Sequence, residues 1–366
     1  NLYIIVFKKK MKLKAHGKVL LYGGYSILET FDGKGGIGLV LNVNKGTFAD
    51  ITKLDYNNCI IEVPRKEISV SGKIENNDLI IEDHKYLKFV IDAIRTTIKH
   101  LKKEGGFSIS LENDKELGYY KMKTGIGSSA TSTVVTVASV LFANGINPIE
   151  NKELVFNLAN QSHRNVQEKI GSGFDISCAV YGSQFYRIPI KGETTHTKIT
   201  SRQHMFPDYF KILIAFSGKS AFTVNLVKNV RKYKEEKESE YTEFMKGYNL
   251  VNEELSEKIL KLPKIYDEKK VEEFVSLLEK SWELRKKLGV LSNTPIETDG
   301  QTNVLQEIKK NGALCAGFSG AGGGDSIVVI CKDDESRNQM IEYLEKNNFN
   351  VFKNLKVGNY PLEIVE

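Results

Sequence analysis

The stretch KTGIGSSATS, residues 123–132, sets two glycines and two serines directly before a run of small and β-branched residues. Glycine accepts backbone angles that other residues avoid, and it lets a ligand approach the main chain. Serine is favoured at the first position of a helix. Residues 129–145 are long enough for a helix that ends at Asn144 and Gly145. Because valine and threonine are weak helix formers, burial must stabilise this helix.

A glycine turn before a helix is a candidate anion site. The first N–H groups of a helix have no partner within it and carry partial positive charge. Glycines that expose these N–H groups favour phosphate, and a serine hydroxyl there can hold a magnesium ion between two phosphates. The stretch is not a P-loop, because no GKS or GKT follows the glycines. A glycine turn with no ligand is the alternative.

Two further glycine loops have the composition of ligand sites. In EKIGSGFDIS, residues 168–177, Asp175 stands where a carboxylate can accept a proton from an acceptor group or orient that group. The alternative is a turn or helix cap. GFSGAGGGDS, residues 317–326, holds five glycines between two apolar strands, more than a hairpin needs. A flexible surface loop is the alternative there.

A fourth segment, AHGKVLLYGGYSILE, occupies residues 15–29. Its Lys18 precedes a strand pattern, and Tyr22 and Tyr25 flank a glycine turn. A lysine beside phosphates would offset their negative charge. A solvent-facing lysine on an edge strand is the alternative.

Composition favours a soluble globular protein. The chain has 366 residues, a net charge of +6, and 41% hydrophobic and 27% charged residues. Basic residues alternate with acidic ones, lysine predominates over arginine, and no basic block stands out, so we expect no nucleic-acid partner. No apolar run approaches the ~20 residues that span a bilayer, so we expect no membrane partner.

The cysteines and the first residues bear on location. Four cysteines lie far apart without a CxxC pair, which fits free thiols in the cytoplasm. The opening NLYIIVFKKK, residues 1–10, has its apolar run before its lysines, the reverse of a secretory signal. Either Met11 is the natural start or residues 1–10 form an edge strand.

The pattern along the chain predicts an α+β fold of two domains. Strand patterns dominate the first half, which also contains helical patterns at residues 84–103 and 151–169. A buried strand is expected at residues 209–218, and charged helices over residues 220–288 with a break at Pro263. Residues 313–355 then read strand, glycine loop, strand, helix, strand.

Together and in this order, the four segments resemble the superfamily of galactokinase, homoserine kinase, mevalonate kinase and phosphomevalonate kinase (GHMP kinases). KTGIGSSA, QEKIGSGFDISCAVYGSQFYR and GAGGGDSI are closest to the eukaryotic-type phosphomevalonate kinases. The resemblance implies a ribosomal-protein-S5-like α/β domain and a ferredoxin-like α+β domain. We assign residues 1–200 to an N-terminal nucleotide-binding domain and residues 201–366 to a helix-rich C-terminal domain with the third glycine loop. The active site would lie between them.

The resemblance also implies residue roles, with ATP and Mg²⁺ as cofactors and 5-phosphomevalonate as the small-molecule substrate. Lys18 and Asp175 would be catalytic. The ATP site would comprise Lys123, Thr124, Gly125, Ile126, Gly127, Ser128, Ser129 and Ala130. The substrate site would comprise Lys18, Tyr25, Ser172, Gly173, Asp175, Gly320, Ala321 and Gly322. Ser129 would hold magnesium, with Glu168 as a second candidate ligand.

The implied reaction is ATP-dependent phosphorylation of (R)-5-phosphomevalonate to (R)-5-diphosphomevalonate in isoprenoid biosynthesis. Candidates for the substrate's own phosphate are Lys169, Arg187 and Arg285. The alternatives are another GHMP kinase such as mevalonate kinase, diphosphomevalonate decarboxylase, or a non-catalytic sensor of the same fold. The chain is expected to be a monomer or a homodimer.

Overall fold

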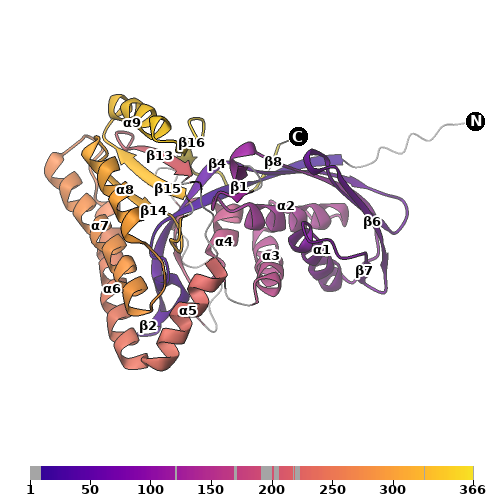
Figure 1. Cartoon of the computed structure of the whole chain (residues 1–366). Coiled ribbons are helices and arrows are strands. Elements are labelled where there is room, and N and C mark those ends of the chain that lie inside the picture. The colour runs from indigo at the N-terminus through magenta and orange to yellow at the C-terminus, as the bar shows by residue number, and fades with distance from the viewer. Residues whose placement is uncertain are drawn as a thin grey trace, which may run out of the picture.

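The computed structural model describes residues 10–119, 122–168, 171–190, 200–201, 206–216, 218, 223–324 and 326–365. The predicted edge strand at residues 1–10 lies outside this part of the chain except for Lys10. Helices and sheets are both abundant in the described residues, which confirms the predicted α+β class (Figure 1).

A large mixed sheet forms the centre of the first half. Its longest strand, β4 (Ile37–Lys53), pairs antiparallel with β1 (Lys10–Tyr22) along one edge. Along the other edge β4 meets β11 (Gln184–Arg187), β17 (Val357–Gly358) and β8 (Phe107–Asn113). The remaining strands are β5 (Asn58–Val63), β6 (Ile68–Glu75), β7 (Asp78–Ile80), β12 (Thr200–Ser201) and β18 (Glu363–Ile364). Strands β5 and β8 run parallel.

Four helices lie on one face of this sheet (Figure 1). They are α1 (Lys88–Leu101), α2 (Ser128–Ala143), α3 (Lys152–Val166) and α4 (Phe174–Tyr181). The predicted helix after the first glycine turn is α2, and it is buried nearly all round, with Val134, Val137 and Leu141 at 0% exposure. Burial on several sides explains why weak helix formers are helical there.

The second half contains its own sheet of β14 (Cys315–Phe318), β15 (Ser326–Cys331), β13 (Lys211–Phe216) and β16 (Asn350–Val351). The predicted charged helices are α5 (Thr223–Glu236), α6 (Glu238–Leu260) and α7 (Glu268–Leu291), with the break near Pro263 between α6 and α7. Helices α8 (Asp299–Lys310) and α9 (Asp334–Lys346) follow. The predicted order strand, glycine loop, strand, helix, strand is confirmed by β14, β15, α9 and β16.

Small elements complete the description. Two-stranded ribbons are formed by β2 (Thr30–Phe31) with β3 (Lys34–Gly35) and by β9 (Gly118–Tyr119) with β10 (Met122–Lys123). Single turns of 3₁₀ helix occur at η1 (Ser26–Leu28), η2 (Pro64–Lys66) and η3 (Lys115–Leu117).

The two halves share a hydrophobic core. Val19 and Leu41 of the large sheet belong to the same buried cluster as Phe274 and Trp282 of α7 and Val328 of β15. The Trp282 indole N–H donates to the carbonyl of Leu21 at 2.8 Å. The division between residues 200 and 201 stays a prediction, and β17 and β18 bring the end of the described chain back to the large sheet.

Candidate active site

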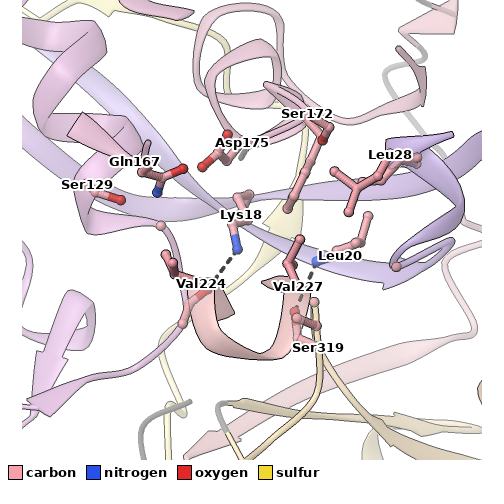
Figure 2. A pocket seen from close by; sticks show the side chains of 18 of the residues that line it. Lys18, Leu20, Leu28, Ser129, Gln167, Ser172, Asp175, Val224, Val227 and Ser319 are labelled. Carbon is pink, nitrogen blue, oxygen red and sulfur yellow. Dashed lines mark hydrogen bonds between the residues drawn. The ribbon is translucent and has the colours of Figure 1, made fainter. Parts of the chain in front are cut away.

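A cavity of about 490 Å³ lies where the two halves meet. Its walls come from the end of β1, the starts of α2 and α4, the start of α5, and the loop between β14 and β15 (Figure 2). The four segments singled out in the sequence therefore meet at one cavity. The predicted site residues that line it are Lys18, Tyr25, Gly125, Gly127, Ser128, Ser129, Ser172, Asp175, Gly320 and Ala321.

The first glycine loop leads into α2 at the cavity wall. Gly127 is the N-cap residue of α2 and has a φ of 100°, in the left-handed region. No side chain caps this helix end. Its first N–H groups therefore remain available to a ligand, and Ser128 and Ser129 line the cavity beside them.

The second glycine loop repeats this arrangement at α4. Gly173 is the N-cap residue, with a φ of 86° and no side-chain cap. A β-carbon at Gly173 would lie 2.6 Å from Oδ1 of Asn160, so a side chain does not fit there. Asp175 stands in the first turn of α4, where the helix dipole favours a negative charge. Two uncapped helix N-termini thus face one cavity.

The Asp175 carboxylate is partly buried, with 18% of its side chain exposed. Its Oδ1 accepts the N–H of Ile176 at 3.0 Å, and its Oδ2 lies 3.8 Å from Nε2 of His163. Nearby, the hydroxyl of Ser172 is buried on the cavity wall and has no hydrogen-bond partner among the described residues. An unsatisfied hydroxyl at a cavity wall is a candidate ligand contact.

The third glycine loop is bound to β1 and to the first loop. Ser319 Oγ accepts the N–H of Leu20 at 3.0 Å, and the Gly320 N–H donates to the Leu20 carbonyl at 3.3 Å. The Ser326 hydroxyl donates to the carbonyl of Thr124. These bonds hold the loop from the second half against strand β1 at the cavity.

Lys18 lies on β1 between the glycine loops. Its Nζ donates to the Gly125 carbonyl at 3.0 Å and lies 5.2 Å from the centre of the Phe174 ring. No carboxylate of the described residues forms an ion pair with Lys18. Lys88, at the start of α1, also lines the cavity.

Several predicted site residues support the loops without lining the cavity. Ile126 is in the core, and its carbonyl accepts the backbone N–H of Lys18 at 2.7 Å. Thr124 is buried and donates to the Glu116 carbonyl, and Ala130 is buried in α2. Gly322 packs its backbone against Ile296. The Lys123 side chain lies outside the described residues, although its backbone belongs to β10.

Glu168, the second candidate metal ligand, does not line the cavity. Its carboxylate pairs with Lys228 Nζ of α5 at 2.6 Å, and 67% of its side chain is exposed. The hydrogen bond and the charge of Lys228 lower the pKa of Glu168 below its ordinary value. The pair links the second glycine loop to α5.

The candidates for the substrate's phosphate have different surroundings. Lys169 lies outside the described residues. Arg187 is not at the cavity, because its guanidinium pairs with Glu253 and donates to the Gly35 carbonyl at 2.9 Å. Arg285 is 1% exposed and donates from Nη1 to the carbonyls of Phe318 and Gly320, at 2.8 and 3.1 Å.

Arg285 is a buried cation that forms no ion pair with any carboxylate of the described residues. Its Nε and Nη2 are buried and have no hydrogen-bond partner among the described residues. A β-carbon at Gly24 would lie 3.5 Å from Arg285 Cδ, and both Gly24 and Gly320 line the cavity. Arg285 therefore lies directly behind two glycines of the cavity wall, Gly24 and Gly320. Burying a charge without an ionic partner costs free energy, and the bonds to the two carbonyls offset part of that cost.

Other cavity residues were missed by the sequence analysis. Lys88, Gln167 and Asn225 line the cavity with polar groups, while Leu28, Val224 and Val227 line it with apolar ones. Figure 2 shows Gln167 and the three apolar side chains. Val224 and Val227 belong to a helical pattern that is equally typical of core packing and of a ligand site. His163, on α3, had no motif around it.

The oxygen donors of the cavity suit magnesium. The described residues contain no cluster of three or more His, Cys, Asp or Glu side chains suited to a metal ion. Magnesium, however, is commonly held by one or two protein oxygens together with the phosphates of a nucleotide. Ser129 Oγ and the Asp175 carboxylate lie on the cavity wall and supply such oxygens.

No helix in the described part of the chain is long and apolar enough to cross a membrane.

Comparison with known proteins identifies the family. The family model for the GHMP kinases N terminal domain matches residues 86–183, and that for the GHMP kinases C terminal matches residues 264–350. The phosphomevalonate kinase of Saccharolobus solfataricus is 31% identical over 335 residues, which are 88% of this chain and 91% of that protein. The chain therefore belongs to the GHMP kinases, the class that its fold and cavity define.

The more particular likeness is to phosphomevalonate kinases. That of Candida albicans is 30% identical over 263 residues, which are 62% of this chain and 61% of that protein. In fold, the chain is similar to Streptococcus pneumoniae phosphomevalonate kinase in complex with phosphomevalonate and AMPPNP. The TM-score is 0.70 at 16% identity, covering 95% of this chain and 99% of that one. The predicted two-domain GHMP kinase fold is confirmed.

Proposed function

We propose that this chain transfers the γ-phosphoryl group of ATP to (R)-5-phosphomevalonate, giving (R)-5-diphosphomevalonate and ADP. The observation that carries the proposal is the meeting of two uncapped helix N-termini, Lys18 and Asp175 at one cavity. The curated relatives at 30 and 31% identity are phosphomevalonate kinases, which supports the choice of acceptor.

The nucleotide's phosphates would bind at the start of α2. Gly125 and Gly127 leave the backbone open, and the free N–H groups of α2 offer donors to phosphate oxygens. Lys18 stands beside this loop, and no carboxylate of the described residues forms an ion pair with it. These groups stabilise negative charge where it is concentrated during phosphoryl transfer.

Magnesium would be held by Ser129 Oγ, with the Asp175 carboxylate as the second protein oxygen. When bound, the ion neutralises charge on the β- and γ-phosphates. Glu168 stays a weaker candidate, because its carboxylate is occupied by Lys228.

The acceptor would lie between Asp175, Ser172 and the third glycine loop, with its aliphatic part against Leu28, Val224 and Val227. An oxygen of its phosphate attacks the γ-phosphorus of ATP, the bond from that phosphorus to the β–γ bridging oxygen breaks, and ADP leaves with the electron pair. A phosphate monoester is already largely ionised at pH 7, since its second pKa is about 6. Asp175 can therefore orient the acceptor without removing a proton.

The test is a coupled assay of ADP release with the purified chain, ATP and Mg²⁺. The acceptor panel comprises (R)-mevalonate, (R)-5-phosphomevalonate, homoserine and galactose. We expect turnover with 5-phosphomevalonate and at least 100-fold lower kcat/KM with the others, the discrimination expected of a site built to bind a charged group.

The other outcomes identify the alternatives. Turnover of mevalonate alone would assign the chain to mevalonate kinase activity. Carbon dioxide released from diphosphomevalonate would indicate the decarboxylase. ATP binding with no turnover of any acceptor would indicate a non-catalytic sensor.

A further inference from the structure

His163 is a buried side chain that connects two walls of the cavity. It lies on α3, and 2% of its side chain is exposed. Its Nε2 is 3.2 Å from Oγ of Ser129 at the start of α2 and 3.8 Å from Oδ2 of Asp175 at the start of α4. One ring nitrogen therefore faces both the serine of the first glycine loop and the aspartate of the second.

The ring is held firmly in place. The Phe89 ring lies against it, with the centroids 5.0 Å apart and the planes inclined by 30°. The backbone carbonyl of His163 accepts the N–H of Gln167 at 3.1 Å in the last turn of α3. Helix α3 packs on α1, α2 and α4. A fixed ring can set the positions of the groups that contact it.

We propose that His163 is a positioning residue for phosphoryl transfer, which fixes the positions of the Ser129 hydroxyl and the Asp175 carboxylate relative to each other. The proposal rests on the function proposed above. In-line transfer requires the donor phosphate and the attacking oxygen to be aligned, and a misplacement of about 1 Å can cost on the order of 100-fold in rate. Ser129 belongs to the donor side of the cavity and Asp175 to the acceptor side.

The chemistry of the two partners defines what His163 contributes. An ionised carboxylate only accepts hydrogen bonds, whereas a hydroxyl both donates and accepts. An N–H at Nε2 therefore suits both neighbours. It can donate a hydrogen bond to Ser129 Oγ, and the partial positive charge of its hydrogen attracts the Asp175 carboxylate. The Ser129 proton is then free to point into the cavity, toward a phosphate oxygen.

Three substitutions separate this role from packing. His163→Gln places an amide N–H at a similar reach, His163→Leu removes the donor, and His163→Glu presents a carboxylate to Asp175. We expect kcat with 5-phosphomevalonate to fall on the order of 10- to 100-fold in the Leu variant and further in the Glu variant. The Gln variant should keep kcat within about fivefold, a loss of about 1 kcal/mol. KM for both substrates should change less than about threefold in the Gln and Leu variants.

Two further measurements control for folding and binding. Ser162→Ala is the matched control on α3, because Ser162 is buried beside His163 and its hydroxyl has no partner among the described residues. It should leave kcat unchanged. The affinity for ATP without Mg²⁺, measured by calorimetry, should be unchanged in the Leu variant, and thermal melting should show each variant folded.

Equal loss of kcat in the Gln and Leu variants would contradict the proposal, as would full activity of the Leu variant. If Leu fails to fold, the Gln and Glu variants still decide, since the proposal requires Gln to be the more active. Failure of the proposed function is distinguishable, because wild type would then not use 5-phosphomevalonate. In that case, kcat of the His163 variants would be compared with the acceptor that the panel identifies.

Discussion

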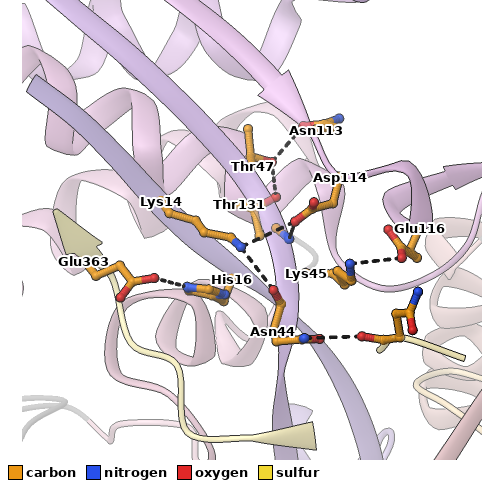
Figure 3. Close-up of polar contacts among 12 residues, drawn as sticks. Lys14, His16, Asn44, Lys45, Thr47, Asn113, Asp114, Glu116, Thr131 and Glu363 are labelled. Atoms are coloured by element: carbon orange, nitrogen blue, oxygen red, sulfur yellow. Dashed lines mark hydrogen bonds and ion pairs between the residues drawn. The ribbon is translucent and has the colours of Figure 1, made fainter. Parts of the chain in front are cut away.

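Lys18 lies beside the first glycine loop, and its Nζ donates to the Gly125 carbonyl. Lys18→Met should lower kcat by on the order of 100-fold or more, comparable to the loss of one preorganised electrostatic contact. Steady-state kinetics with 5-phosphomevalonate measure this. Lys14→Met is the matched control, because Lys14 lies on the same strand and pairs with Asp114 outside the cavity (Figure 3). Near wild-type turnover of Lys18→Met would remove Lys18 from the site.

Asp175 tests whether the acceptor needs a base. Because a phosphate acceptor ionises with a pKa of about 6, Asp175→Asn should retain more activity than the loss of a general base allows, a decrease of less than about 100-fold. In the wild-type chain and in Asp175→Asn alike, kcat/KM should fall as the pH drops below about 6, since the phosphate of the acceptor then becomes protonated. A decrease of about 10,000-fold in Asp175→Asn, together with loss of the pH dependence, would instead identify Asp175 as the base.

At the scale of elements, Arg285 of α7 is one of the residues that hold the third glycine loop in place. Arg285→Met keeps the side chain's length and removes the charge and the bonds to the carbonyls of Phe318 and Gly320. Hydrogen bonds from a charged donor are worth about 1.5–3 kcal/mol, so KM for the acceptor should rise at least about tenfold. KM for ATP should change little, because the first loop belongs to another element.

Arg187→Met provides the comparison for that prediction. Arg187 pairs with Glu253 away from the cavity, so its loss should lower the melting temperature and leave KM for the acceptor unchanged. A higher acceptor KM for Arg187→Met with no change for Arg285→Met would reverse the assignment.

The local sequence predicted the elements that carry their own signals. The glycines and serines at residues 125–129 and the small and β-branched residues that follow them were enough to predict α2 and its N-terminus. Helix α4 has eight residues between two glycines, too few for a helical period to appear, so its sequence does not predict a helix. The two-residue strands β17 and β18 could not be predicted, because only their partners in the large sheet make them strands.

Some residues of the candidate site also have a local signal in the sequence, and others have none. Lys18 and Asp175 were predicted because glycine turns stand beside them, a local signal. His163 was missed, since its importance depends on Ser129 and Asp175, which lie on other helices. Lys88 was missed because a lysine at the start of an amphipathic helix normally faces solvent. Contacts between distant segments carry no mark in a single sequence.

At the scale of the whole molecule, the end of the chain is tied to its beginning through His16. Its Nε2 lies 2.8 Å from Oε1 of Glu363 on β18 (Figure 3). Burial lowers the pKa of His16 below 6.5, with Lys14 adding to the decrease and Glu363 opposing it. Folded His16 is therefore neutral at pH 7.

Stability should consequently depend on pH. The unfolded chain takes up the His16 proton near pH 6.5, whereas the folded chain does so only at lower pH. The contribution of His16 is thus fully present above pH 6.5 and is lost as the pH falls toward the folded pKa. The loss is about 1.4 kcal/mol for each pH unit over which only the unfolded chain is protonated. Urea unfolding of His16→Gln should show a smaller decrease between pH 7 and 5 than wild type, and equal decreases would contradict this.

The cavity as a whole requires both halves of the chain, because Lys18, the two helix N-termini and the third glycine loop come from elements far apart in sequence. The shared core of β1, α7 and β15 holds them together. If these parts form one phosphotransfer site, the product of the reaction is a diphosphate ester.

The most direct measurement is phosphorus NMR of the wild-type chain with ATP, Mg²⁺ and (R)-5-phosphomevalonate. We predict that the monoester resonance disappears as ADP forms in equal amount, and that two coupled resonances of a new diphosphate ester replace it. An unchanged monoester resonance, or inorganic phosphate released from ATP instead, would contradict the proposal that this chain phosphorylates 5-phosphomevalonate.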